Sequence, residues 1–137
     1  MGLIRLQSSN LPTGSMLQVV QATSNTTLQT STTSTWHDLA PTVTITPESS
    51  SNKILVSHTA GMMQYQTPYS VFFRLLRDST EVVKIGRVYT NLSSSGWQGY
   101  IAAFEYLDSP ATTSSVTYKW QLFMENTGQI RHNNSTG

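Results

Sequence analysis

The chain has 137 residues, a formal net charge of +1 and no cysteine, and only 11% of its residues are charged. A chain of this length fits one domain that buries roughly two-thirds of its unfolded surface, so neither a disulfide nor a metal is needed to hold it. Because a near-neutral chain has little attraction for phosphates, we expect neither nucleic acid nor a membrane as a partner. No apolar leader or run of transmembrane length is found, which predicts a soluble, unprocessed protein.

Residues 1–14 are predicted to form an extended arm ahead of the domain. Apolar side chains alternate only briefly in this arm, at Leu3, Ile4 and Leu6, and Pro12-Thr13-Gly14 marks a turn. A segment this short cannot form a core of its own. We therefore expect Leu3, Ile4 and Leu6 either to bind a neighbouring chain or to pack along their own domain, which we assign to residues 15–137.

The domain is predicted to open with a strand over residues 15–23. Residues 25–35, which follow, are almost entirely Ser and Thr. β-Branched Thr suits an edge strand that faces solvent, whereas a polar tract of low complexity could equally be a mobile loop. We favour the edge strand.

Residues 42–78 form the centre of the predicted fold. Three runs of β-branched and aromatic residues are separated there by Pro, Gly, Ser and Asn, a pattern typical of strands joined by turns. The period of two divides the third run into two faces, which are Val71, Phe73 and Leu75 on one side and Phe72, Arg74 and Leu76 on the other. Because a single copy of the sandwich would leave the second face exposed to solvent, we predict that Phe72, Arg74 and Leu76 form an interface between copies.

The second half of the chain continues as strands, predicted over residues 81–89, 97–107, 116–125 and 129–132. Gly86 in the middle of the first run indicates a bulge or a close approach of another backbone. The run over 116–125 has the cleanest alternation, with Tyr118, Trp120, Leu122 and Met124 on one face. In the run before it, Tyr100, Ala102, Phe104 and Tyr106 share a face.

This series of short strands without a credible helix predicts an all-β fold, a two-sheet antiparallel β-sandwich. Local pattern does not separate a jelly roll from an immunoglobulin-like topology. The long polar connections around Ser49 and Ser94 suit Greek-key crossovers better than a simple meander, and they favour the jelly-roll type.

No pattern typical of catalysis or metal binding is found. The three histidines lie on separate elements without the short spacing of metal ligands, the acidic residues are scattered, and no nucleophile elbow occurs. His58 shares a strand face with Ile54, Val56 and Ala60, which predicts a hydrogen-bonded core or interface histidine. We therefore expect a non-enzyme with no catalytic residues, no metal and no cofactor.

Three aromatic residues, Trp36, Trp97 and Tyr100, lie beside turn signals. Their rings could present a flat face to a sugar or to a protein partner. Equally, they could cap the ends of the sandwich core. The first alternative makes them possible receptor-facing residues.

Several junctions between strands and turns follow one another in a recognisable order. They are Leu11 to Gln21, Ile45-Thr46-Pro47, Ser49 to Val56, Phe73 to Thr80, Tyr106 to Pro110, and Thr117-Tyr118-Lys119. In this order the chain resembles, over residues 11–125, a widespread family of small bacteriophage virion proteins and tail-fibre terminal domains. The chain departs from the family in ending with Arg131-His132-Asn133 rather than an aliphatic strand, which leaves open a neighbouring chain as the cover of the last sheet edge.

The resemblance implies a trimeric β-sandwich displayed on the virion surface after assembly in the host cytoplasm. Our first hypothesis is a capsid decoration or head-fibre protein that binds capsid or tail proteins and stabilises the particle. No fibre shaft precedes residue 15, so we expect this role over that of a long tail fibre. The alternative is a tail-fibre or receptor-binding module that recognises host-surface carbohydrate through Trp36, Trp97 and Tyr100. An enzyme that degrades polysaccharide would need two facing carboxylates, which nothing in the sequence indicates.

Overall fold

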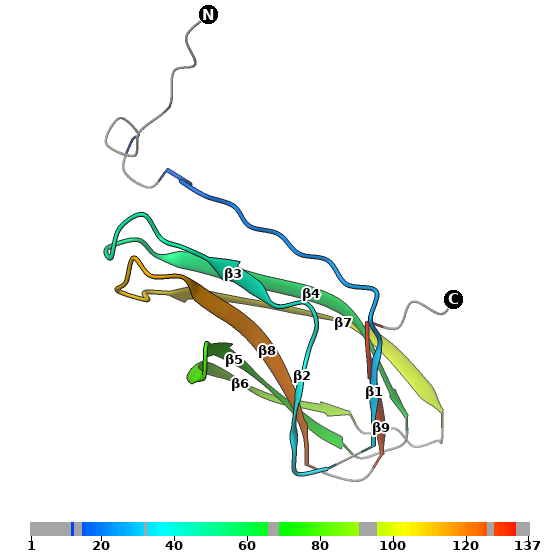
Figure 1. Cartoon of the computed structure of the whole chain (residues 1–137). Coiled ribbons are helices and arrows are strands. Elements are labelled where there is room, and N and C mark those ends of the chain that lie inside the picture. The colour runs from blue at the N-terminus through cyan, green and yellow to red at the C-terminus, as the bar shows by residue number, and fades with distance from the viewer. Residues whose placement is uncertain are drawn as a thin grey trace, which may run out of the picture.

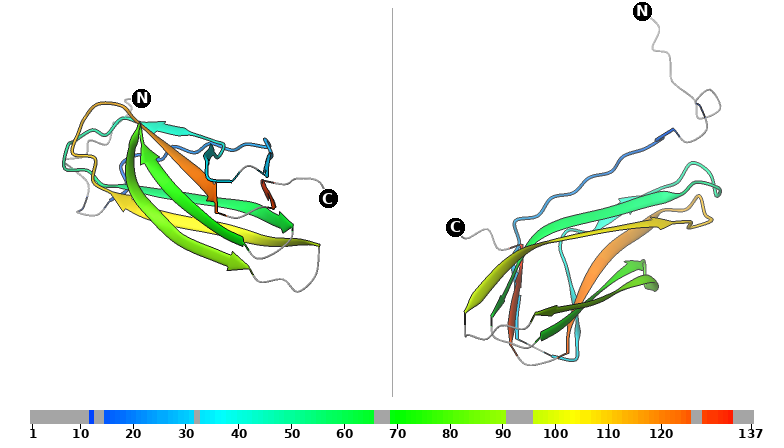
Figure 2. Two further views of the ribbon diagram at one scale, coloured as in Figure 1. Left: turned by 90° about the horizontal axis from the view of Figure 1, so that it is seen from below. Right: turned by 180° about the vertical axis from the view of Figure 1, so that it is seen from behind.

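The computed structural model describes residue 12 and residues 15–31, 33–65, 69–90, 96–125 and 128–133. Within this part of the chain every regular element is a strand, and no helix is long and apolar enough to cross a membrane. The strands are β1 (Leu28–Thr30), β2 (Trp36–Asp38), β3 (Val43–Ile45), β4 (Ile54–Tyr65), β5 (Tyr69–Arg77), β6 (Thr80–Thr90), β7 (Trp97–Asp108), β8 (Val116–Met124) and β9 (Gln129–His132). Figures 1 and 2 show them as two facing layers.

The strands form a four-stranded sheet of order β1-β9-β4-β7 and a five-stranded sheet of order β2-β8-β5-β6, with β3 also paired to β8. β2 and β3 are two halves of one edge strand, interrupted around the cis Ala40–Pro41 bond. Strands then pair from the chain ends inward, β1 with β9, β2 and β3 with β8, β4 with β7, and β5 with β6, all antiparallel. This rolled-up pairing is the jelly-roll pattern, and it confirms the predicted all-β sandwich.

The hydrophobic core lies between the two sheets. Phe104 on β7 is partly buried and packs against the core, and the centroid of its ring lies 4.4 Å from that of Phe73 on β5 and 5.2 Å from that of Trp120 on β8. The predicted inward faces are confirmed by burial, as Val71, Phe73, Leu75, Tyr118, Trp120, Leu122 and Met124 are all buried. Alternation along β5 and β8 therefore predicted the core because one side of each strand is closed from water.

The prediction of a strand over residues 15–23 is wrong. The backbone from residue 15 to 27 is extended, but no strand pairing is found for it within the described residues. Pairing begins only at β1, which forms the edge of the four-stranded sheet and confirms in part the predicted edge strand over 25–35. The predicted arm residues Leu3, Ile4 and Leu6 lie outside the described residues.

The bulge at Gly86 is confirmed. Val71 pairs with Val88 while Phe73 pairs with Ile85, so two residues of β6 lie opposite Phe72 alone. Insertion of one residue in this way bends the strand and increases its twist.

The structure corrects the prediction that the Leu76 side chain is exposed to solvent in a single copy. Its exposed fraction is only 7%. Its cross-strand neighbours are Glu81 on β6 and Lys119 on β8. The aliphatic stems of such long side chains can cover apolar surface on a neighbouring strand, so one chain already buries Leu76.

Candidate interaction surfaces

The outer face of the five-stranded sheet carries an aromatic patch, formed by Trp36 on β2, Phe72 on β5 and Phe123 on β8. The centroid of the Phe123 ring lies 5.2 Å from that of Trp36 and 6.1 Å from that of Phe72. All three side chains are half-buried. The structure thus brings Phe72, predicted as an interface residue, onto the same face as Trp36, which was assigned to a different predicted site.

Two cations lie over this aromatic patch. The Arg74 guanidinium carbon is 4.1 Å from the centre of the Trp36 ring, and Lys84 Nζ is 5.3 Å from the centre of the Phe72 ring. Both are cation–π distances. The patch is therefore partly covered by its own chain.

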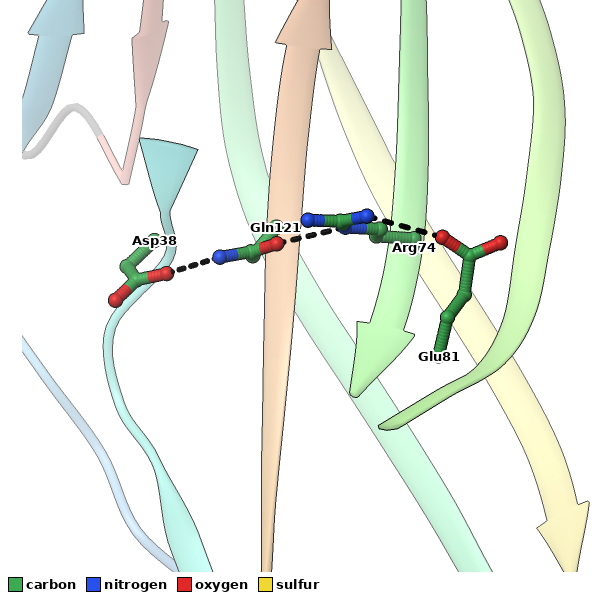
Figure 3. A network of polar contacts seen from close by, with 4 residues as sticks. All are labelled: Asp38, Arg74, Glu81 and Gln121. Atoms are coloured by element: carbon green, nitrogen blue, oxygen red, sulfur yellow. Dashed lines mark hydrogen bonds and ion pairs between the residues drawn. The ribbon is translucent and has the colours of Figure 1, made fainter. Parts of the chain in front are cut away.

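A row of polar side chains holds Arg74 in place, and it crosses strands β2, β8, β5 and β6 (Figure 3). Gln121 Nε2 donates to Asp38 Oδ1 at 2.5 Å, and Arg74 Nε donates to Gln121 Oε1 at 2.7 Å. Arg74 Nη1 forms an ion pair with Glu81 Oε2 at 3.1 Å. The row fixes the guanidinium above Trp36.

Asp38 ends this row and stays ionised. Partial burial opposes the charge on this carboxyl group, but hydrogen bonds from Gln121 and Lys119 and the positive charges of Lys119 and Arg74 outweigh it and lower the pKa of Asp38. Lys119 Nζ lies 2.9 Å from Asp38 Oδ2. The face is thus a mixed aromatic and ionic surface whose charges are largely paired within the chain.

The outer face of the four-stranded sheet carries an interrupted apolar strip, formed by Leu55 on β4 and Ile101 and Leu107 on β7. Their exposed fractions are 59%, 76% and 54%. Ala103 and the charged Glu105 lie between Ile101 and Leu107 on the same face of β7. Leu55 and Leu107 are direct cross-strand partners. The sequence analysis missed this strip, although the period of two that places Tyr100 and Tyr106 inward also places Ile101 and Leu107 outward.

The three predicted receptor-facing residues do not share a surface. Trp36 lies on the five-stranded sheet, whereas Trp97 lies on the four-stranded sheet, where its ring contacts Tyr65 at 5.3 Å and the Arg131 guanidinium at 4.2 Å. Tyr100 points inward beside Met62, and its hydroxyl is buried without a hydrogen-bond partner. Burial raises the pKa of Tyr100 to about 12.

His58 is the hydrogen-bonded, partly buried histidine that its strand face predicted. Its Nε2 lies 3.0 Å from Nε2 of His132, so one ring donates and the other accepts. Burial lowers the pKa of His58, and burial together with the charge of His58 lowers the pKa of His132 to about 4. Among the described residues no group of three or more His, Asp or Glu side chains could hold a metal ion.

Similarity to known proteins is found among solved structures. No protein-family model matches the chain, and no curated protein matches it. Among solved structures, a chain from the infectious bursal disease virus Gx strain is 11% identical, with 78% of this chain and 32% of that chain covered and a TM-score of 0.30. A chain from T=1 particles derived from infectious bursal virus is 9% identical, with 77% and 31% covered and a TM-score of 0.29. Our chain spans about a third of the length of these neighbours.

Proposed function

We propose that this chain is a structural protein of a bacteriophage particle, a capsid decoration or head-fibre protein that forms a trimer and binds capsid or tail proteins. The observation that carries the proposal is that one copy leaves several large apolar side chains exposed to solvent. Met16, Val19 and Ile101 have exposed fractions of 76%, 73% and 76%. Exposed apolar surface of this kind marks sites of protein association.

The resemblance to phage virion proteins supports this role, because its motifs have a structural task here. Motif residues from β5, β7 and β8 meet at one end of the sandwich. Asp78 N donates to Thr117 O at 2.7 Å, and Thr117 N donates back to Asp78 Oδ1 at 2.9 Å. Arg77 pairs with Asp108 at 2.8 Å. The Arg77–Asp108 pair joins the two sheets, and the Asp78–Thr117 hydrogen bonds fasten the β5–β6 turn to β8. These structural tasks favour a protein that contributes surfaces rather than reactive groups.

The two open surfaces have different parts in the proposal. The extended segment with Met16 and Val19 serves contacts between copies, and the apolar strip of Leu55, Ile101 and Leu107 serves contact with the particle. A protein that binds only the assembled lattice stabilises that lattice by mass action, by about 2.7 kcal/mol per site when its free concentration is a hundred times Kd. No chemical step is needed for this role.

A carbohydrate-binding role is less well supported by the geometry. Aromatic rings that bind sugars need an open face, and the rings of Trp36 and Trp97 each have a guanidinium within 4.2 Å of their centre. A glycan array would decide between the two roles. Binding that is lost in Trp36→Ala or Trp97→Ala would support the receptor-binding module, and no binding supports the structural role.

Two measurements test the proposal directly. Light scattering of the purified chain should give a mass three times that of the 15.2 kDa monomer. An antibody raised against the purified chain should label intact particles of the parent phage in electron micrographs, on the head or on the tail. A monomeric mass would contradict the trimer, and particles that remain unlabelled would contradict the structural role.

A further inference from the structure

The four-stranded sheet has a gap beside the first half of β4. β4 pairs with β7 along its whole length, but β9 pairs only with Met62–Tyr65 at its far end. β1 lies on the other side of β9, two strand spacings or about 10 Å from β4. Residues 15–27, which lead into β1, run alongside β4 across this gap (Figures 1 and 2). The gap is one strand wide.

One wall of the gap is a free backbone edge. Gly61 O accepts a hydrogen bond from Asn133 N at 2.7 Å, so the carbonyl of Gly61 faces the gap. Groups on an antiparallel strand face alternate sides, which directs the N–H and C=O of Leu55, Ser57 and Thr59 into the gap as well. Within the described part of the chain, no strand pairs with this edge between residues 54 and 61. A free edge of this kind is a template for another strand.

The gap also has a floor and a closed end. A cavity of about 400 Å³ separates residues 20–24 from residues 56–60, and Tyr118 and Trp120 of β8 are among the residues that line it. Asn133 closes one end, because its Nδ2 donates to the carbonyl of Ser24 and its own carbonyl accepts from Thr27 Oγ1 at 2.9 Å. These hydrogen bonds of Asn133 therefore hold the two walls of the gap, residues 20–24 and residues 56–60, apart.

The same chain carries an extended apolar segment that belongs to neither sheet among the described residues. Residues 15–20 are extended (Figure 1) and belong to no strand pair within the described ranges. Their apolar side chains are open, with Met16 76%, Leu17 39%, Val19 73% and Val20 41% exposed. Leu17 and Val19 alternate with Met16 and Val20, so both faces of this segment are apolar, as in strands covered on both sides. The local sequence favours a strand here, and the described part of its own chain supplies no edge for it.

This segment cannot enter the gap of its own chain. Leu28, His132 and Met62 lie level in the sheet. Counting back from this row along an extended chain places residue 20 level with residue 54, and residues 15–19 beyond the end of β4. The chain that continues from this segment enters β1, which lies two strand spacings from β4. The segment is free to reach a second copy.

We propose that residues 15–20 of one copy add as a strand to the free edge of β4, residues 54–61, in a second copy. This inference rests on the self-association in the proposed function and names its contact surface. Each copy carries one free strand and one free edge, so head-to-tail exchange around a threefold axis leaves neither unpaired. The added strand brings backbone hydrogen bonds to Ser57 and Thr59, and it covers the cavity above Trp120.

Disulfide trapping tests the contact, because the chain has no cysteine of its own. Two double variants sample neighbouring registers of the added strand against β4. The first combines Val19→Cys with Ser57→Cys, and the second combines Val19→Cys with Thr59→Cys. After oxidation, covalent dimers and trimers are expected on a non-reducing gel for at least one of them. A disulfide requires Cα atoms within about 7 Å. Inside one chain the same count places residue 19 level with residue 53, which is about 13 Å along the sheet from residue 57 and farther from residue 59. The control pairs Val19→Cys with Ser79→Cys, in the β5–β6 turn of the other sheet.

A proline variant gives an independent measurement. Ser57→Pro removes an N–H that faces the gap and leaves the hydrogen bonds to β7 intact. We expect the mass from light scattering to fall from three copies to one, with the β-type circular dichroism spectrum retained. Ser57→Ala keeps the N–H and should stay trimeric.

The outcomes separate this inference from the proposed function. A trimer that forms no cross-link in either double variant, or that survives Ser57→Pro, overturns the strand exchange and leaves the trimer standing. A cross-link inside one chain also overturns it. A wild-type protein that is monomeric overturns both.

Discussion

Arg77 on β5 and Asp108 on β7 form an ion pair that joins the two sheets, with Nη1 and Oδ2 2.8 Å apart. The same carboxylate oxygen accepts a hydrogen bond from the Tyr118 hydroxyl at 2.6 Å. Asp108 is only 6% exposed. A carboxylate buried to this degree depends on its partners, since an unpaired buried charge is costly.

Arg77→Met should therefore be one of the most destabilising changes in the chain. It keeps the aliphatic stem but leaves the Asp108 carboxylate without a positive partner, and we expect a loss of about 3 kcal/mol in the free energy of unfolding. Urea denaturation at pH 7 measures it. The double variant Arg77→Met with Asp108→Asn removes both charges and should lose clearly less. Equal losses in the single and double variants would contradict this account of the pair.

Tyr118→Phe tests the second partner of Asp108. Loss of one hydrogen bond to a buried carboxylate should cost about 1–3 kcal/mol at pH 7. Burial, followed by the hydrogen bond to Asp108, raises the pKa of Tyr118 above its usual 10. The unfolded chain therefore releases this proton first, and wild-type stability should fall as the pH rises above 10. The variant should show a shallower fall between pH 10 and 12, measured by thermal unfolding. Parallel profiles would rule out this role of Tyr118.

The sequence predicted those parts of the fold that depend on neighbours along the chain. Alternation over β8 placed Trp120 and Leu122 in the core because that strand is closed on one side. The strand expected at residues 15–23 failed for the opposite reason. A strand needs a partner edge, and the nearest edge in space is separated from it by a gap that local pattern cannot show.

The candidate surfaces were predictable only in part for the same reason. Phe72 and Arg74 could be placed on one face of their strand, but Trp36 joins them only because β2 pairs with β8 and β8 with β5. For Tyr100 the sequence left open a surface ring or a cap of the core, and only its pairing with Met62, a core residue, shows that it points inward. Pairing between distant segments decides which aromatic residues are open.

The paired histidines predict a loss of stability in acid. The pKa of His132 is lowered from about 6.5 to about 4, first by burial and then by the charge of His58. Between these values the unfolded chain binds the extra proton and the folded chain does not, so stability is full above pH 6.5 and falls as the pH drops to 4. The loss should be roughly 2 to 3 kcal/mol.

Replacing both histidines, His58→Leu with His132→Leu, removes the groups that titrate. The melting temperature of this variant should depend less on pH between 6.5 and 4 than that of the wild type. Melting curves recorded at half-unit intervals of pH measure the difference. If the two profiles have the same slope, other groups cause the acid sensitivity.

Arg74 at the centre of the outer polar row should matter more than its partial exposure indicates. Arg74→Met removes the donor to Gln121 and the cation above Trp36, and it leaves the buried Gln121 amide oxygen without its partner. We expect a loss of about 1–2 kcal/mol, since each term is of order 1 kcal/mol. Lys84→Met removes two longer cation–π contacts, at 5.3 Å from the Phe72 ring centre and 5.5 Å from the Trp36 ring centre, and should change stability by less than about 0.5 kcal/mol. Thermal unfolding of the two variants side by side tests this order.

The apolar strip on the four-stranded sheet gives the sharpest test of particle binding. Ile101 is 76% exposed, so Ile101→Glu should change the stability of the free protein by no more than about 0.5 kcal/mol. If the strip contacts the particle, burying the new carboxylate is costly, and co-sedimentation with particles that lack the protein should weaken at least tenfold while the trimer persists. Ser79→Glu, on the β5–β6 turn of the other sheet, adds the same charge away from the strip and should bind as the wild type does. Undiminished binding of Ile101→Glu would exclude the strip as the contact.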